Sequence, residues 1–297
     1  MTRLAWPAEL ATGLGRSLPV YDAAQSLRLD LHGDPARAQL VVCSDGNHHM
    51  ALEETLQAFA EAYPDVGEIF YSTTPPRIAV EIVRGGGLQI GNFRLTITPH
   101  VFIGPPQVMD TLVAEARVSK QTPFMQGRGL ALLVRKGNPR HIAGIADLLR
   151  DDVRLFLSNP ATETVSYRIY VDCLTRIAAA QNMTLDFLAH APGQPDPKKL
   201  VYGEVIHHRE APQRVADGTA DVAAVFYHLG LRYQRIFPEI FEIVPLLRSP
   251  DETNCNVGHF NCGLVGDGGR WGAQLFQFLL SAQVTTIYAR HGLERPA

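Results

Sequence analysis

The chain has 297 residues, of which 46% are hydrophobic and 19% charged, so it can build ordinary globular cores and is not a disordered protein. Its formal net charge of −3 excludes a general attraction to nucleic acid. No apolar run approaches the roughly 20 residues that a membrane-spanning helix needs. We therefore expect neither a nucleic-acid partner nor membrane insertion, and a chain of this length predicts about two domains.

The N-terminal region comes before the first predicted strand. Residues 1–37 are expected to form an N-terminal extension with a short helix over residues 23–31. Glu9 interrupts the apolar core that an export signal needs, so the sequence as given predicts a cytoplasmic protein. The alternative is a periplasmic protein whose export signal has been removed. We expect the four cysteines to be free thiols, although Cys255 and Cys262 could pair across a strand turn.

The most informative stretch is a strand that turns directly into a helix. Residues 40–42 predict a buried strand, and residues 44–47 (Ser-Asp-Gly-Asn) predict a tight polar turn. The apolar residues that follow have helical spacing: Leu52, Leu56, Phe59 and Tyr63. The N-terminus of such a helix attracts anions because its N–H groups are free and its dipole is positive there. Asn47 is predicted to cap this helix and also to contact a ligand.

Three further strand ends carry hydroxyl, amide or tyrosine side chains. They are residues 67–71 followed by 72–77, residues 153–157 followed by 158–164, and residues 221–226 followed by Tyr227. The carboxyl edge of an open α/β sheet is where such folds bind ligands. The pattern therefore predicts an α/β protein in which polar side chains from four strand ends form the binding site.

The order of the predicted elements indicates two lobes. The chain leaves a first α/β lobe near Gly129, builds a second, and returns to the first near Val257. We expect lobe 1 to comprise residues 38–128 and 257–297, and lobe 2 to comprise residues 129–256. Two connecting segments between lobes make a hinge, and hinged lobes close on ligands.

Several segments together resemble a known family. They are MALEETLQAFAEAYP, HVFIGPPQVMDTLV, GLALLVRKGNP, IADLLRDDVRLFLSNP, KKLVYGE, ADGTADVAAVFY and FQFLLSAQVTTIYARHGL. Their order and spacing over residues 38–293 resemble the type 2 periplasmic binding proteins, and among them the molybdate- and tungstate-binding proteins of ABC transporters. The resemblance implies a two-lobed α/β fold with two hinge crossings, in which each lobe is a mixed sheet flanked by helices.

The resemblance also implies a set of ligand-binding positions. In that family uncharged donors hold the oxyanion: serine hydroxyls, backbone N–H groups and a tyrosine. Carried over by position, they give the predicted ligand-binding residues Asn47, Thr73, Thr74, Thr164, Val165, Ser166 and Tyr227. Ser44, in the same turn as Asn47, is also predicted to bind the ligand. Pro75 and Pro76 depart from the family pattern, since proline has no N–H group to donate.

Histidines and arginines give further candidates near these positions. They are His48, Arg77, His100, His207 and His228. Neutral imidazole is the commonest transition-metal ligand, so the histidines could bind a metal cation or metal complex. Alternatively, together with arginine, they could hold an anion larger or more acidic than molybdate. The sequence leaves the presence of a metal open.

No catalytic motif is present. Ser44, Asp45 and His48 are the residue types of a nucleophilic triad, but they lie too close in sequence to form its usual geometry. No Gly-x-Ser-x-Gly motif occurs, and the glycines at 85–87 fit neither a P-loop nor a dinucleotide turn. We expect no enzyme activity and no cofactor.

These observations predict a solute-binding protein that closes on a small anion, most simply a tetrahedral oxyanion of the molybdate and tungstate class. Its partners would be that anion and, if the protein is exported, an ABC transporter permease. The alternative is a cytoplasmic ligand sensor on the same fold. The expected oxyanion contacts are helix N-termini and neutral hydrogen-bond donors.

Overall fold

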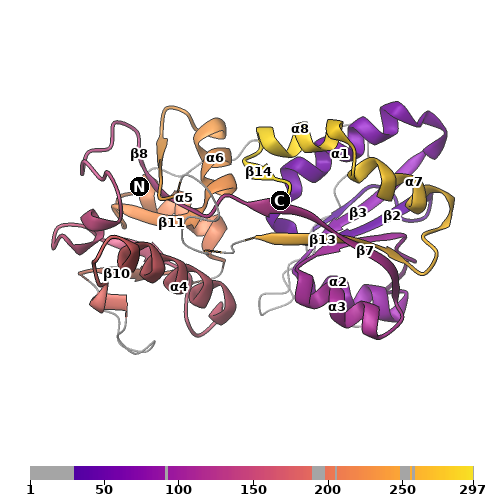
Figure 1. Ribbon diagram of the computed structural model, residues 1–297, viewed down its shortest axis with the longest axis horizontal. Coiled ribbons are helices and arrows are strands. Elements are labelled where there is room, and N and C mark those ends of the chain that lie inside the picture. Colours follow the sequence, from indigo (N-terminus) through magenta and orange to yellow (C-terminus); the bar gives the residue numbers. More distant parts are fainter. Residues whose placement is uncertain are drawn as a thin grey trace. The chain divides into compact units, whose positions relative to one another are not determined.

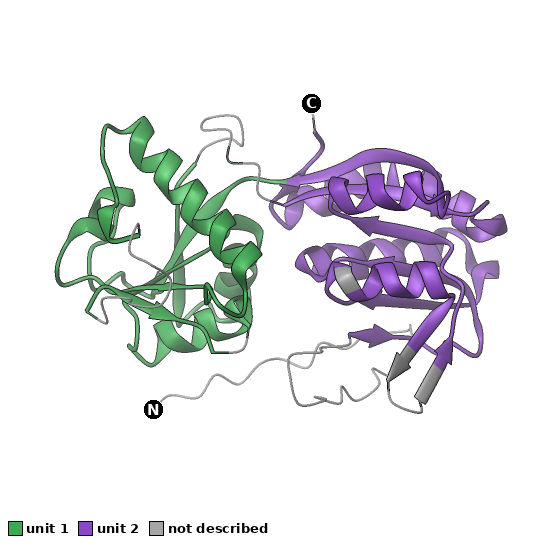
Figure 2. Cartoon of the chain, turned by 90° about the horizontal axis from the view of Figure 1, so that it is seen from below, with its two compact units in different colours: residues 1–7, 127–257 green, residues 8–126, 258–297 purple. Residues whose placement is uncertain are grey.

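The computed structural model describes residues 30–90, 93–188, 198–204, 206–247, 255 and 258–296. The chain divides into two compact α/β units, shown in Figure 2. Unit 1 contains residues 127–257, together with residues 1–7, and unit 2 contains residues 8–126 and 258–297. The chain passes from unit 2 to unit 1 after Gln126 and returns after Val257.

Unit 2 is built on a mixed sheet in which seven of the described strands are arranged in the order β1-β3-β2-β6-β13-β7-β14. These strands are β1 (Leu31–His32), β2 (Ala38–Ser44), β3 (Glu68–Thr73), β6 (Val101–Gly104), β7 (Val118–Gly127), β13 (His259–Val265) and β14 (Leu293–Glu294). The strands β3, β2 and β6 are parallel, whereas β13 is antiparallel to both of its neighbours. A small hairpin is formed by β4 (Gly87–Ile90) and β5 (Phe93–Thr96).

Helices cover both faces of the unit 2 sheet, as Figure 1 shows. The helices are α1 (His49–Ala62), α2 (Pro76–Gly85), α3 (Pro106–Ala114), α7 (Gly269–Leu279) and α8 (Ala282–Arg290). Along β2 the buried side chains alternate: Leu40 and Val42 join the core beneath α1, α7 and α8, while Val41 and Cys43 join the core beneath α2 and α3. This alternation is the period of two that a strand imposes. It explains why a continuous apolar run forms this strand.

Unit 1 has a mixed sheet of five described strands in the order β10-β9-β11-β8-β12. The strands are β8 (Leu130–Arg135), β9 (Leu155–Leu157), β10 (Leu200–Tyr202), β11 (Val222–Phe226) and β12 (Phe241–Pro245). The helices are α4 (Thr164–Ala180), α5 (His207–Ala216) and α6 (Tyr227–Ile236). The strands β10, β9 and β11 are parallel, and β8 runs antiparallel to β11 and to β12. None of the described helices is long and apolar enough to cross a membrane.

The N-terminal expectation is corrected where the structure describes it. Most of the helix expected over residues 23–31 lies outside the described residues. Leu31, however, is in strand β1, which pairs antiparallel with β3 through Leu31 and Ser72. The side chain of Leu31 is buried in the core beneath α2 and α3. Burial of this apolar side chain against the sheet outweighs a local helical preference.

The expectation of four free cysteines is wrong. Cys173 on α4 and Cys255 form a disulfide, with their Cα atoms 5.3 Å apart and a sequence separation of 82 residues. The remaining two, Cys43 and Cys262, are free and buried. Cys262 lies on β13 in the core of unit 2, so it does not pair with Cys255. The disulfide joins two segments that only the folding of unit 1 brings together, so no local spacing could indicate it.

Candidate functional site

The candidate site of unit 2 lies at the carboxyl edge of its three parallel strands. Ser44 at the end of β2 is paired in register with Thr73 of β3 and with Ile103 of β6. The residues that follow, Asp45 and Thr74, therefore lie at the same level of the sheet. After each of them the chain turns into a helix, which is the geometry of a ligand-binding edge in open α/β sheets.

The turn after β2 is capped by Asp45 and not by Asn47. Asp45 Oδ1 accepts the N–H of Asn47 at 2.9 Å, and Asp45 is the N-cap of the 3-10 turn Gly46–His48 that leads into α1. The prediction that Asn47 caps the helix is therefore wrong. An aspartate side chain accepts the N–H two residues further on as readily as an asparagine does, and Asp45 comes first in the chain. The side chain of Asn47 is partly exposed at this edge.

Burial makes the Asp45 carboxyl group a weaker acid. The residue is only 5% exposed. Burial raises the pKa of Asp45 to about 6, and the N–H groups of Asn47 and Gly46 offset part of that rise. The charge of this side chain therefore changes close to neutral pH.

Ser44 and His48 belong to a buried hydrogen-bond network. His48 Nε2 lies 3.0 Å from Ser44 Oγ, and His48 Nδ1 lies 2.9 Å from the Tyr288 hydroxyl on α8. Both Ser44 and His48 are fully buried, and the imidazole ring also packs against Phe260 at 4.4 Å between centroids. The Ser44 hydroxyl donates to the Asp45 carbonyl oxygen at 3.0 Å. Through these contacts His48 anchors the first turn to α8, and both of its ring nitrogens are bonded within the protein rather than directed to a ligand.

The second turn offers few N–H donors. Thr73 Oγ1 lies 3.3 Å from His32 Nε2. The buried Thr74 Oγ1 has no hydrogen-bond partner among the described residues. Helix α2 has Pro75 as its N-cap and Pro76 as its first residue, so two positions at this helix N-terminus lack an N–H. Helix α3 likewise begins with two consecutive prolines. The side chain of Arg77, a predicted candidate, lies outside the described residues.

His100 lies at the opposite edge of the unit 2 sheet. It comes directly before β6, at the amino end of that strand, and its Nδ1 accepts the N–H of Val41 at 2.9 Å. Burial lowers the pKa of His100. The structure therefore does not bring His100 together with Ser44, Thr73 and the other candidates of the carboxyl edge.

In unit 1 the helices α4, α5 and α6 begin at the carboxyl edge of the parallel strands. Thr164, Val165 and Ser166 are the first three residues of α4, and the Val165 side chain is 74% exposed. The Thr164 hydroxyl donates to the Pro160 carbonyl at 2.8 Å. Ser158, directly after β9, is fully buried, and its Oγ has no hydrogen-bond partner among the described residues. A buried hydroxyl without a partner costs free energy unless a ligand or water bonds to it.

Tyr227 is the first residue of α6 and lies at the same edge. Its N–H donates to the Gly129 carbonyl at 2.9 Å, which ties α6 to the start of β8. The Arg128 guanidinium lies over the Tyr227 ring, 5.0 Å from its centroid. Arg128 was not among the predicted residues. Its signal in the sequence is a basic residue flanked by glycines where the chain enters unit 1.

His207 and His228 are part of the unit 1 core. His207 is stacked on Phe156 with ring centroids 5.2 Å apart, and His228 is stacked on Phe226 at 5.7 Å. Each histidine is 1% exposed. Burial lowers the pKa of His207 to about 3, so its ring is neutral. Among the described residues no group of three or more histidine, cysteine, aspartate or glutamate side chains is placed to hold a metal ion.

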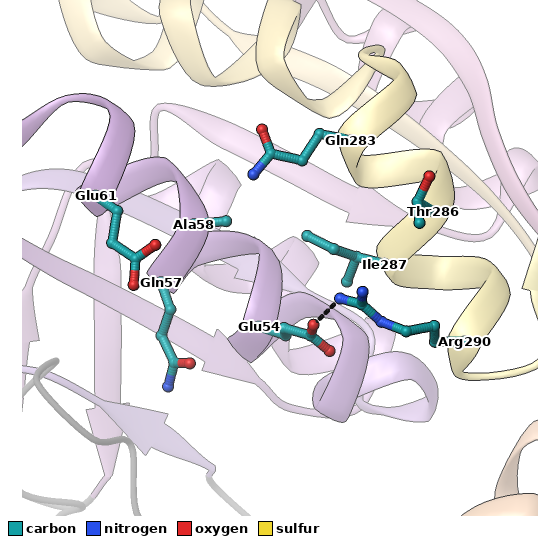
Figure 3. A pocket seen from close by; sticks show the side chains of 8 residues that line it. All are labelled: Glu54, Gln57, Ala58, Glu61, Gln283, Thr286, Ile287 and Arg290. Carbon is teal, nitrogen blue, oxygen red and sulfur yellow. Dashed lines mark hydrogen bonds and ion pairs between the residues drawn. The ribbon is translucent and has the colours of Figure 1, made fainter.

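A pocket of about 500 Å³ lies elsewhere on unit 2, between α1 and α8 (Figure 3). Its lining residues are Glu54, Gln57, Ala58, Glu61, Gln283, Thr286, Ile287 and Arg290. Arg290 forms an ion pair with Glu54, whose other oxygen bonds to His291 Nε2 at 2.7 Å. None of the predicted ligand-binding residues lines this pocket.

The fold is shared with solved structures of binding proteins. The substrate-binding domain of a putative molybdenum ABC transporter from Clostridium difficile is 16% identical, with a TM-score of 0.61 over 87% of this chain and 99% of that one. The tungstate-binding protein TupA from Desulfovibrio alaskensis is 8% identical, with a TM-score of 0.58 over 87% and 98%. The sulfate-binding protein SubI from Mycobacterium tuberculosis is 14% identical, with a TM-score of 0.61 over 86% and 86%. These likenesses confirm the predicted type 2 periplasmic-binding-protein fold.

The family is established by a match at the level of the sequence. No curated protein sequence matches the chain. A family model described as a bacterial extracellular solute-binding protein does match, over residues 40–294. That range includes the strands and helices of both carboxyl edges. The chain therefore belongs to the bacterial extracellular solute-binding protein family.

Proposed function

We propose that this solute-binding protein binds a small tetrahedral oxyanion, of the class that includes molybdate and tungstate. The observation that carries the proposal is the carboxyl edge of unit 1. There the N-termini of α4 and α6 lie at the strand ends, and the Arg128 guanidinium lies beside Tyr227. Positive helix termini and a guanidinium both favour an anion.

The buried hydroxyl of Ser158 supports the same ligand class. Its position directly after β9 is at this edge, and an oxyanion oxygen would accept the hydrogen bond that Oγ lacks among the described residues. The names of structurally similar proteins also support the class: one is the substrate-binding domain of a putative molybdenum ABC transporter, and the others are tungstate- and sulfate-binding proteins. By the same analogy, the partner of the chain would be an ABC transporter permease.

The proposed compartment is an oxidising one, such as the periplasm, rather than the cytoplasm expected from the sequence. The support is the Cys173–Cys255 disulfide. Structural disulfides persist in secreted and periplasmic proteins and are rare in the reducing cytosol. Mass spectrometry of the protein isolated from its native cells, with free thiols blocked at lysis, tests this: a reduced pair would contradict it.

Isothermal titration of ligand-free, folded protein tests the proposed ligand class. The titrants are molybdate, tungstate, sulfate and phosphate. We expect saturable binding at a single site for at least one of them. Absence of heat with all four, confirmed by an unchanged melting temperature in their presence, would contradict the oxyanion proposal.

Two substitutions test the two carboxyl edges separately. Tyr227→Phe removes a hydroxyl group from the edge of unit 1, and Asn47→Ala removes an amide from the edge of unit 2. A hydrogen bond to a charged group contributes about 1.5–3 kcal/mol, so each change should weaken oxyanion binding by about tenfold or more. The melting temperature of the ligand-free protein should hardly change, because Asp45 and not Asn47 caps the turn.

The matched control is Tyr63→Phe. Tyr63 follows α1, at the end of the helix opposite to the turn that carries Asn47, and packs against Phe59 and Phe278. The Tyr63→Phe variant should bind the oxyanion with the same affinity as the wild type. Unchanged affinity in both Tyr227→Phe and Asn47→Ala would show that these two side chains do not contact the ligand.

A further inference from the structure

Asp45 is a buried carboxylic acid at the carboxyl edge of the unit 2 sheet. Among the described residues its carboxylate accepts backbone N–H groups of its own turn, including that of Asn47 at 2.9 Å. Within the described residues, the causes of its pKa shift are burial and the N–H groups of Asn47 and Gly46, and none of them is a cation. An aspartate that is 5% exposed costs free energy when it is charged, unless another group neutralises it.

Among the described residues, few backbone N–H donors are available around Asp45. The N–H of Asn47 is already taken by the Asp45 carboxylate. Helices α2 and α3, which follow the strands β3 and β6, each have proline both as the N-cap and as the first residue. Thr74, which directly follows β3 at the level of Asp45, is fully buried and has a hydroxyl without a hydrogen-bond partner among the described residues. Two oxygen-bearing side chains thus stand where N–H donors would otherwise be.

We propose that Asp45 is a ligand-binding residue that shares one proton with an oxygen atom of the bound oxyanion, next to the Thr74 hydroxyl. This inference rests on the proposed function and specifies how the site of unit 2 meets the ligand. A charged carboxylate repels a dianion, whereas a single proton between the two oxygens gives a charge-assisted hydrogen bond. For sulfate or molybdate the solvent supplies that proton, and hydrogen phosphate brings its own.

The acidity of Asp45 agrees with this role. Its pKa of about 6 in the free protein is above the ordinary value of about 3.9. A nearby anion would raise the pKa further, so at pH 8 binding would take up a proton from solvent. Affinity for a dianion should therefore increase as the pH falls from 8 and level off below about 6, where free Asp45 is already protonated.

Other titratable side chains lie near this edge, and they are unchanged when Asp45 is replaced with asparagine. His48 and His49 follow Asp45 in the chain. The ring nitrogens of His48 are bonded to Ser44 and Tyr288. A ring nitrogen of His49 is bonded to the Gly46 carbonyl. His32, beside β3, lies 3.9 Å from Asp30. The parallel strand β6 ends in Gly104 and contributes no titratable group at its carboxyl end. A pH effect that depends on Asp45 can therefore be separated from one that depends on histidine.

The experiment is isothermal titration of the full chain with sulfate and molybdate at pH 7 and pH 8, in buffers of different ionisation enthalpy. The wild type should take up about one proton per bound anion, and its affinity should fall by about tenfold over this pH unit. Asp45→Asn keeps the cap, since asparagine is as good an N-cap as aspartate, but removes the acidic proton. It should bind both anions without proton uptake and with little pH dependence.

The matched control is Asp147→Asn, which changes another capping aspartate, whose Oδ2 accepts the N–H groups of Ala143 and Gly144 in unit 1. It should keep the proton uptake of the wild type. Hydrogen phosphate should bind the wild type at pH 8 without uptake. Because the folded-state pKa of Asp45 is raised, its contribution to stability is lost as the pH rises through about 6. The melting temperature of Asp45→Asn at pH 8 should thus equal or exceed that of the wild type.

Three results would overturn parts of this picture in distinguishable ways. Binding of sulfate or molybdate by the wild type without proton uptake would overturn the role of Asp45 and leave the proposed function standing. Proton uptake that persists in Asp45→Asn would assign it to the histidines and overturn the inference as well. Absence of binding by all four oxyanions, in both the wild type and Asp45→Asn, would overturn the proposed function itself.

Discussion

Replacing Gly46 with alanine should lower the free energy of unfolding by about 1–3 kcal/mol and weaken oxyanion binding at the same time. A Cβ atom at Gly46 would lie 2.6 Å from the carbonyl oxygen of Thr73. The obstacle is backbone, which cannot rotate away as the end of a long side chain can. The turn after β2 and the turn after β3 must therefore move apart, and both carry predicted ligand-binding residues. Urea denaturation and titration of the same preparation measure the two effects.

Gly85→Ala is the matched control for this prediction. Gly85 is the last residue of α2, and a Cβ atom there would meet nothing within 4 Å. Alanine is the better helix former by about 1 kcal/mol, so the control should be as stable as the wild type or slightly more so. If Gly46→Ala proves as stable as Gly85→Ala, the two turns are not in the close contact that the structure shows.

Breaking the disulfide between Cys173 and Cys255 should destabilise unit 1 by about 2–4 kcal/mol. The cross-link closes a loop of 82 residues, and a long closed loop restricts the unfolded chain strongly. Urea unfolding with and without a reductant gives the difference. Hydrogen exchange should show loss of protection in unit 1, while the core of unit 2 keeps its protection.

Alanine variants make the disulfide measurement specific. Cys173→Ala, Cys255→Ala and the double variant should have closely similar stabilities, because each lacks the cross-link. None of the three should respond to the reductant, since the other cysteines, Cys43 and Cys262, are free thiols. A reductant effect of equal size in the double variant would mean that the wild-type effect does not come from this disulfide.

The individual strands and helices could be predicted because their determinants are local, whereas the type 2 periplasmic-binding-protein fold was implied by the family resemblance. The apolar run at residues 40–42, the polar turn and the helical spacing of Leu52, Leu56 and Phe59 are adjacent in the chain. Each specifies an element without reference to distant residues. In the structure these three side chains are fully buried in the core of unit 2. The alternation of strands and helices then leaves few arrangements of the sheet.

The details of the candidate site depend on distant residues, and there prediction was weaker. His48 is buried because Tyr288, 240 residues later, bonds to its ring. His100 stands at the start of β6, and its ring accepts the N–H of Val41, 59 residues earlier, at the edge opposite to the other candidates. Asp45 and Asn47 are both favoured cap residues and lie only two positions apart, so local sequence preferences cannot decide which of them caps the turn. The assigned ligand contacts remain predictions that the substitutions above will test.

The position of β13 has a consequence for how the chain folds during synthesis. This strand lies in the middle of the unit 2 sheet, between β6 and β7, but it comes from residues 259–265. A ribosome must therefore make all of residues 127–257 before this interior strand of unit 2 emerges. Until then β6 and β7 have unpaired backbone edges, which are sites of aggregation. Unit 1 can complete its sheet first, and a nascent chain stalled before His259 would depend on chaperones to shield the unfinished half.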